Sequence, residues 1–176
     1  MTGLHIREAR EDDRDAIREV TLAAYQEYAA VMPAHWEGYK QGILATLADV
    51  TPAEQLVAVQ DDLLVGAVLL FPADSRLTGP DGVEVSLIWP EIRLLAVAPA
   101  ARGRGIGAEL IRECLRHARQ AGAMAVTLHT TDMMRVAQGM YVRMGFERAP
   151  EIDFQPAPGI TIKGYRFEFD KMSPSS

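Results

Sequence analysis

The stretch Arg102-Gly103-Arg104-Gly105-Ile106-Gly107 joins a strand pattern that ends near Pro99 to a helical pattern. Glycine lets the backbone approach an anion without a Cβ in the way. The first N–H groups of a helix have no intrahelical partner, and the helix dipole favours negative charge beside them. Arg102 and Arg104 add positive charge that suits phosphate oxygens. The stretch therefore predicts a pyrophosphate site at a strand-to-helix junction.

Two common phosphate motifs fit this stretch less well. A Walker A loop needs Gly-Lys followed by Ser or Thr, and the stretch has none. Gly103, Gly105 and Ala108 do satisfy the dinucleotide pattern G-x-G-x-x-G/A. That motif also opens a βαβ unit and is followed about 20 residues later by an acid for the ribose. Here four expected strands come first, and the next strand ends at Leu128-His129-Thr130 without an acid, which disfavours a dinucleotide site.

Apolar periodicities on both sides of the stretch predict a mixed α/β domain with the order β-α-α-β-β-β-α-β-α-β-β. Upstream we expect strands and helices at residues 4–8, 11–28, 34–48, 55–59 and 63–71, and then one extended run, 83–88 and 92–98, that Pro90 bends. Downstream we expect a helix from 106 to 118 closed by Gly122, a strand at 125–128, a helix through Tyr141, and strands from 145 and at 160–169. Thr131 or Asp132 is expected to cap the last helix. Residues 72–82 and 149–159 are expected to be loops.

The bulk composition favours one globular domain over residues 1–172, with a disordered tail at 173–176. A net charge of -6 argues against a nucleic-acid partner, and no apolar run is long enough to span a membrane. The single cysteine, Cys114, is expected in the core of a protein from a reducing compartment, and we expect the cytoplasm. The histidines show no metal-ligand spacing, so no metal is expected.

Two motifs together resemble the Gcn5-related N-acetyltransferase (GNAT) family. Arg102, Gly105 and Gly107 match its Arg/Gln-x-x-Gly-x-Gly/Ala signature. Residues 137–146, Ala-Gln-Gly-Met-Tyr-Val-Arg-Met-Gly-Phe, resemble its A-x-x-x-Y-x-x-x-G-F stretch, and residues 95–99 resemble its fourth strand. The chain is identified on these motifs as a member of the family, although Met134 stands where many members have an asparagine.

The resemblance implies acetyl-CoA as co-substrate and direct attack by an amine on its thioester. Backbone N–H groups of the glycine-rich loop are expected to hold the CoA pyrophosphate; by position these belong to Arg102, Gly103, Arg104, Gly105, Ile106, Gly107 and Ala108. The pantetheine arm is expected beside the preceding strand at Leu95, Ala96 and Val97. A backbone N–H near Val97 is expected to stabilise the oxyanion that forms during attack.

Proton transfer needs an acid and, for a protonated amine, a base. Tyr141 matches the family's usual acid, with a buried packing tyrosine as the alternative. Glu91 is the leading candidate for the base, acting directly or through water, and the alternative is an exposed acid at a strand end. His129 is the second candidate, and a reaction without a dedicated base stays open.

The resulting hypothesis is an N-acetyltransferase that acts on a primary amine of a small molecule or peptide. The alternative is a non-catalytic acyl-CoA-binding regulatory protein, which could dispense with Tyr141 and Glu91. The expected partners are acetyl-CoA and an amine acceptor, with neither nucleic acid nor membrane. Residues 160–169 could pair across a homodimer. Tyr25, Tyr28 and Trp36 form either core or a wall that binds the acceptor by cation–π contact.

Overall fold

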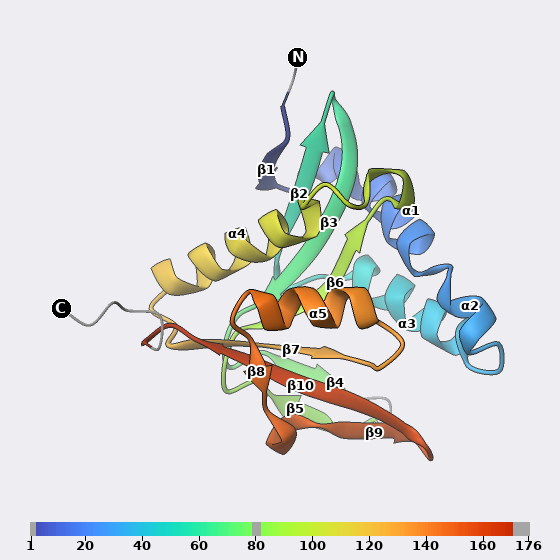
Figure 1. Cartoon of the computed structure of the whole chain (residues 1–176), viewed down its shortest axis with the longest axis vertical. Coiled ribbons are helices and arrows are strands. Elements are labelled where there is room, and N and C mark those ends of the chain that lie inside the picture. The colour runs from blue at the N-terminus through green and yellow to red at the C-terminus, as the bar shows by residue number, and fades with distance from the viewer. Residues whose placement is uncertain (1–2, 79–81, 171–176) are drawn as a thin grey trace. The chain divides into compact units, whose positions relative to one another are not determined.

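A computed structural model describes residues 3–78 and 82–170 of the chain (Figure 1). The chain packs as two compact units, which we describe separately. The first unit holds the residues up to 70 together with 94–114, and the second holds 71–93 together with those from 115 onward. The prediction of one domain over residues 1–172 stays a prediction. The tail at 173–176 lies outside the described residues.

Antiparallel strands form the sheet of the first unit (Figure 1). They are β1 (His5–Glu8), β2 (Glu54–Gln60) and β3 (Leu63–Phe71). The two-residue turn of the β2–β3 hairpin places Asp61 and Asp62 at positive φ, as tight hairpin turns require. The amide of Ala98, just after β6 (Glu91–Val97), donates to the Val65 carbonyl at 2.8 Å. These strands confirm the ones expected at 4–8, 55–59 and 63–71.

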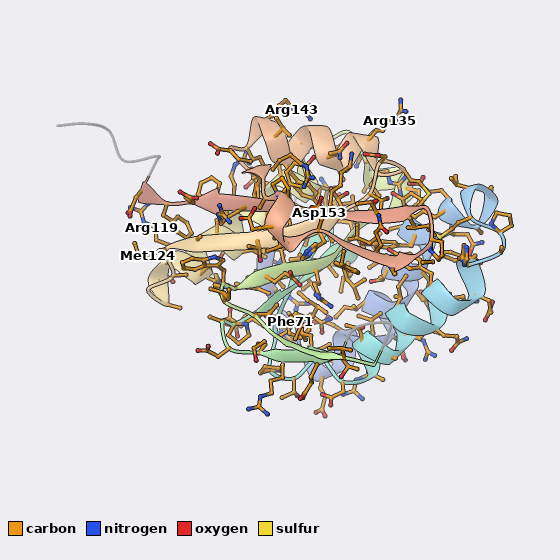
Figure 2. All side chains as sticks on the ribbon, turned by 90° about the horizontal axis from the view of Figure 1, so that it is seen from below. Phe71, Arg119, Met124, Arg135, Arg143 and Asp153 are labelled. Atoms are coloured by element: carbon orange, nitrogen blue, oxygen red, sulfur yellow. The ribbon has the colours of Figure 1, made fainter. Side chains whose placement is uncertain are left out.

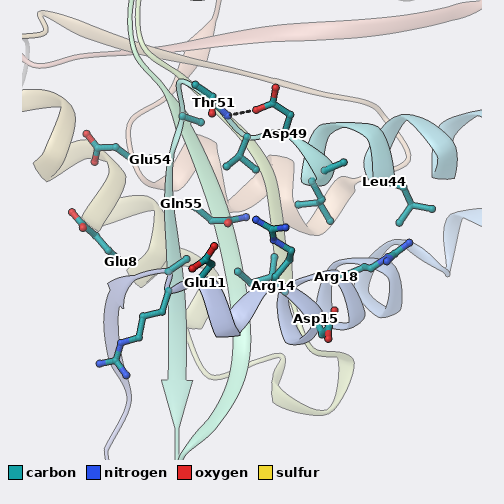
Figure 3. Close-up of a pocket in the computed structure, with 17 residues that line it drawn as sticks. Glu8, Glu11, Arg14, Asp15, Arg18, Leu44, Asp49, Thr51, Glu54 and Gln55 are labelled. Atoms are coloured by element: carbon teal, nitrogen blue, oxygen red, sulfur yellow. Dashed lines mark hydrogen bonds between the residues drawn. The ribbon is translucent and has the colours of Figure 1, made fainter.

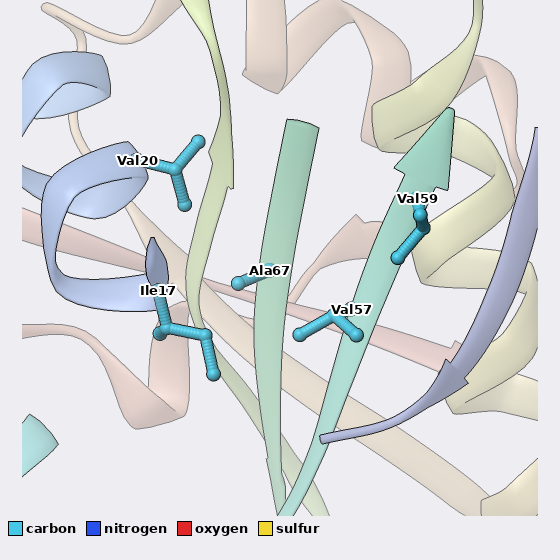
Figure 4. Packing of buried hydrophobic residues seen from close by; sticks show 5 residues of the cluster. All are labelled: Ile17, Val20, Val57, Val59 and Ala67. Carbon is cyan, nitrogen blue, oxygen red and sulfur yellow. The ribbon is translucent and has the colours of Figure 1, made fainter. Parts of the chain in front are cut away.

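The helix expected over 11–28 is divided into three pieces, and the one expected over 34–48 forms a single helix. These helices are α1 (Arg14–Tyr25), preceded by the 3-10 turn η1 (Glu11–Asp13), α2 (Tyr28–Val31) and α3 (Trp36–Ala48). Ile17 and Val20 point from α1 into a buried cluster with Val57, Val59 and Ala67 of the sheet (Figure 4). Positions three and four residues apart share one helix face, so the cluster follows directly from the sequence pattern.

Strands of both directions make up the sheet of the second unit. Its elements are the start of β6, β7 (Ala125–Thr130), α5 (Arg135–Arg143), β8 (Glu147–Arg148), the 3-10 turn η3 (Pro150–Ile152), β9 (Phe154–Ala157) and β10 (Ile160–Glu168). β7 runs parallel to β6 and antiparallel to β10. At Tyr165 and Arg166, β7 and β8 occupy both edges of β10, so this part of the strand has no edge left for a second copy. Pairing across a homodimer stays a prediction.

Two predicted loops contain regular structure. Residues 76–78 form β4 (Arg76–Thr78), which pairs with β5 (Glu84–Ser86), although a loop was expected over 72–82. The loop expected over 149–159 holds η3 and β9, and β9 pairs with β10. Strands of three or four residues are too short to show an alternating pattern, so the sequence carried no period to detect.

The predicted cap of α5 is wrong. Met134 occupies the N-cap position, and no side chain there bonds to the helix. Asp132 instead pairs with Lys163 of β10 at 2.6 Å. Because α5 begins at Arg135, Asp132 lies two residues before the N-cap position. Figure 2 labels Arg135 and Arg143, which lie at the two ends of α5 and point away from the strands of this unit. Among the described residues, no helix combines the length and apolar content needed to cross a membrane.

Candidate functional site

The glycine-rich loop adopts the geometry that the sequence predicted for an anion site. After β6 comes the 3-10 turn η2 (Pro99–Ala101), and four residues separate its end from the start of α4 (Ile106–Gln120). Gly103 has φ 79° and Gly105 has φ 76°, both in the left-handed region that only glycine adopts freely. A Cβ at either position would meet nothing within 4 Å, so the loop presents open backbone on that side. The N-terminus of a four-turn helix follows it, which favours an anion.

The two arginines of this loop differ in their contacts. The Arg102 guanidinium donates to the Glu27 carboxylate at 2.8 Å and to the Ala24 carbonyl at 2.9 Å. Arg104 makes one long contact to the Gln60 side chain, at 3.5 Å. Both arginines were predicted to bind the pyrophosphate. In this structure the backbone N–H of Arg102 donates to the Pro99 carbonyl at 3.4 Å, and its side chain is held by Glu27 and Ala24.

The end of β6, predicted to lie along the pantetheine arm, is anchored by a tyrosine. Tyr25 of α1 donates its hydroxyl to the Leu95 carbonyl at 3.0 Å. Leu94 has φ 51°, an uncommon value for a non-glycine residue inside a strand, and it interrupts the regular extension of β6. Ala96 is buried, whereas Leu95 and Val97 are half-buried. The cofactor-binding role of these three residues stays a prediction.

Glu91, the predicted base, is a buried carboxylate in the second unit. Its side chain is only 2% exposed, so it is not the exposed strand-end acid of the alternative interpretation. It forms ion pairs with Arg93 on the same face of β6 and with His129, whose Nδ1 lies 2.9 Å from its Oε1. Burial would raise the pKa of Glu91, but the hydrogen bond from His129 and the charge of Arg93 hold it below its usual range.

The strand register brings His129 to Glu91. Glu91 pairs with Thr127 in the parallel β6–β7 ladder, and His129 stands two residues further on the same face. The other ring nitrogen, Nε2, lies 2.8 Å from the Ile152 carbonyl of η3. Oxygen acceptors on both ring nitrogens favour the doubly protonated imidazolium. Burial lowers the pKa of His129, but the bond and charge of Glu91 and the Ile152 carbonyl raise it above its usual value overall.

Tyr141, the predicted acid, lies on α5 in the core of the second unit. It is 7% exposed, and its ring packs 5.8 Å from the ring of Phe146. Phe146 in turn packs 5.5 Å from Phe167 of β10. This environment is compatible with both interpretations that the sequence left open, a general acid or a packing tyrosine. The catalytic role stays a prediction.

Sequence reasoning named Glu91 and His129 as rival bases, and the structure joins them in one cluster. It missed Arg93, although residues two apart in a strand share a face and the Glu-x-Arg spacing signals such a pair. It also missed Ile152 as a partner of His129 and Glu27 as a partner of Arg102. Neither contact leaves a local signal, because the partners lie far apart in the chain.

A cavity of about 670 Å³ lies elsewhere in the first unit (Figure 3). It is bounded by α1, α3 and the ends of β1 and β2, and charged side chains such as Glu11, Arg14 and Asp15 surround it. None of the residues predicted for cofactor binding or catalysis lines it. The predicted chemistry therefore rests on the glycine-rich loop and the Glu91 cluster and not on this cavity.

Comparisons with known proteins agree with the motifs. Residues 16–146 match the acetyltransferase (GNAT) family. A mycothiol acetyltransferase of Cellulomonas flavigena is 36% identical over 110 residues, which are 61% of this chain and 30% of that protein. N-acetyltransferase 8B of Rattus norvegicus is 29% identical over 75% of this chain and 59% of its own length. The chain thus spans less than two thirds of the length of these curated relatives.

A solved structure supports the same assignment. A GNAT-family acetyltransferase from Brucella melitensis, in complex with acetyl-CoA, superposes with a TM-score of 0.59 and 27% sequence identity. The match covers all of this chain and 92% of that one. The left-handed glycines ahead of α4, the mixed α/β fold and the family match over most of the chain lead to one conclusion. This chain belongs to the GNAT family of acetyltransferases.

Proposed function

We propose that this protein is an N-acetyltransferase that transfers the acetyl group of acetyl-CoA to a primary amine of a small molecule or peptide. The observation that carries the proposal is the open, left-handed loop at Gly103 and Gly105 in front of α4. Acetyl-CoA bound in the Brucella melitensis relative supports this choice of co-substrate. The family match favours acetyl transfer over simple binding of the cofactor.

In the proposed reaction the amine nitrogen attacks the thioester carbonyl. The new C–N bond forms while the carbonyl oxygen gains negative charge, which the backbone N–H of Val97 stabilises. A donor of this kind is typically worth about 3 kcal/mol. The C–S bond then breaks, Tyr141 gives its proton to the departing thiolate, and the products are the acetylated amine and CoA.

The amine must lose a proton before or during attack, and Glu91 is the proposed acceptor. The cluster around Glu91 supports this role because Arg93 and His129 lower its pKa and keep it ionised at neutral pH. An ionised carboxylate can accept a proton directly or through water. The same contacts weaken it as a base, and His129 is the second candidate. Its raised pKa favours the protonated ring, which must lose a proton before it can accept one from the amine.

An acetylation assay with a panel of amines tests the proposal through the release of the CoA thiol. The panel should include the acceptor used by mycothiol acetyltransferases, because several relatives carry that name. Cys114 is fully buried and burial raises the pKa of its thiol, so it should not react with the thiol reagent in the folded protein. We expect CoA release that depends on one class of amine. Tight acetyl-CoA binding without release for any amine would favour the regulatory protein instead.

A further inference from the structure

The side chain of Arg102 links the glycine-rich loop to the end of α1. One guanidinium nitrogen donates to the Glu27 carboxylate at 2.8 Å, and another donates to the Ala24 carbonyl at 2.9 Å. All three residues belong to the first unit, where the loop runs beside α1 (Figure 1). The contact joins segments that are 75 residues apart in the chain. It therefore reflects the folded arrangement and not local geometry.

Both acceptors suit an arginine at this point. Ala24 lies in the last turn of α1, where helix carbonyls have no intrahelical partner and cations are favoured by the dipole. Glu27 lies between α1 and α2 and supplies a full negative charge. A planar guanidinium can donate to both at once, whereas a lysine amine has no such fork. Arg102 therefore acts as a C-terminal cap of α1 that is contributed by the loop.

A second bond ties the same helix end to β6. Tyr25, the last residue of α1, donates its hydroxyl to the Leu95 carbonyl, which lies seven residues before Arg102 in the sequence. Together the two ties hold the end of α1 against both the strand and the loop that follows it. The loop itself contains two left-handed glycines, which give its backbone little intrinsic preference for one conformation. A contact with residues outside the loop is thus needed to hold its backbone in one conformation.

We propose that Arg102 is a positioning residue that holds the loop in its anion-binding conformation, and that Arg104 is the side chain that contacts the pyrophosphate. This inference rests on the proposed binding of acetyl-CoA. Arg104 suits that role because it is exposed and makes only the long contact to Gln60 among the described residues. Arg102 is matched to it in charge and lies in the same loop, so each arginine is the control for the other.

Replacement of Glu27 distinguishes positioning from direct binding by the sign of its effect. If Arg102 bound the pyrophosphate with its side chain, Glu27 would compete for it, and Glu27→Gln would tighten acetyl-CoA binding. If Arg102 positions the loop, Glu27→Gln weakens the tie and weakens binding. Exposed ion pairs are worth little, so we expect a loss of roughly two- to five-fold in affinity.

The experiment measures acetyl-CoA affinity by calorimetry at several salt concentrations. The variants are Glu27→Gln, Arg102→Gln, the double variant and Arg104→Gln. Arg102→Gln should bind more weakly but keep the salt dependence of the wild type, and the double variant should bind like Arg102→Gln because both changes cut one tie. Arg104→Gln should flatten the salt dependence, since it removes a direct charge contact. Acetyl-pantetheine, which lacks the pyrophosphate, should bind all four variants like the wild type.

Tighter binding by Glu27→Gln, or unchanged binding by both Glu27→Gln and Arg102→Gln, would overturn the positioning role. A flattened salt dependence in Arg102→Gln and not in Arg104→Gln would exchange the two assignments and overturn it as well. These results differ from a failure of the proposed function, which would appear as a folded wild type that does not bind acetyl-CoA. Unfolding curves of each variant separate loss of the tie from loss of the fold.

Discussion

Glu91 and His129 set opposite limits on the pH range in which their cluster stabilises the second unit. The pKa of Glu91 is lowered from 4.5, so its contribution is present above pH 4.5 and is lost as the pH falls through the lowered value. The pKa of His129 is raised from 6.5, so its contribution is complete below pH 6.5 and is lost as the pH rises through the raised value. The pair is therefore most stabilising between these two values.

Replacement of His129 should remove the alkaline limit. At pH 6 we expect His129→Gln to lower the free energy of unfolding by about 3 kcal/mol, the low end for a broken buried pair, because Arg93 still faces Glu91. The difference from the wild type should shrink as the pH rises above 6.5. Melting temperatures over pH 5.5–9 give the measurement. If the melting temperatures of the variant and the wild type differ by the same amount at every pH, the charge of His129 does not contribute to stability.

Tyr141 is the residue whose replacement best tests the proposed chemistry. Tyr141→Phe keeps the ring that packs on Phe146 and removes only the hydroxyl. A general acid typically contributes a factor of 10² to 10⁴ to the rate, so we expect kcat to fall by roughly 100-fold with acetyl-CoA affinity nearly intact. Steady-state kinetics and calorimetry on the same preparation supply both values. Unchanged turnover would leave Tyr141 as a packing residue.

Gly66 of β3 lies where this strand packs tightly against β6 and α4 of the first unit. A Cβ built there lies 3.0 Å from the Ala96 carbonyl oxygen and 3.0 Å from Leu110 of α4. Gly66→Ala should therefore destabilise the protein by about 1–3 kcal/mol through overpacking. Gly38→Ala is the matched control, because Gly38 lies in α3 with nothing within 4 Å of its Cβ position. There we expect a gain of about 0.5–1 kcal/mol from the lower helix propensity of glycine.

Denaturant unfolding measures both glycine variants under the same conditions. A destabilised Gly38→Ala would contradict the helix-propensity argument, and a neutral Gly66→Ala would show that the sheet and α4 can move apart at no cost. Gly66→Ala should also affect cofactor binding, because Ala96 belongs to the strand end predicted to hold the pantetheine arm. The affinity of this variant for acetyl-CoA should fall if its new methyl group displaces the Ala96 carbonyl.

The elements that the sequence predicted are long enough for a regular spacing of apolar residues to be recognised. α1 shows its buried face at Ile17, Val20 and Ala24, and the β2–β3 hairpin has long apolar runs with an Asp-Asp turn. The strands β4 and β9 escaped notice because each has only three or four residues, whereas β5 lies within the strand expected at 83–88. Their pairing is decided by the partner strand and not by their own sequence.

At the scale of the whole molecule, ligand protection tests the proposed co-substrate. A ligand at 100 times its Kd stabilises the native state by about 2.7 kcal/mol if it does not bind the unfolded chain. For a chain of this length that corresponds to a rise of roughly 5–10 °C in melting temperature. We expect this rise with acetyl-CoA and none with NAD at the same concentration. An equal rise in melting temperature with NAD would indicate that the loop binds a dinucleotide.

The main helices, the long strands and the loop at Gly103 and Gly105 could be predicted from local sequence, because they depend on backbone preferences and on patterns within a few residues. Tertiary structure alone decided that Glu91 is buried with His129 and that Arg102 turns to Glu27. Such contacts depend on strand register and on helix packing between distant segments, which no local pattern records. The sequence could name these side chains, but only the fold selects their partners and thereby their pKa values and roles.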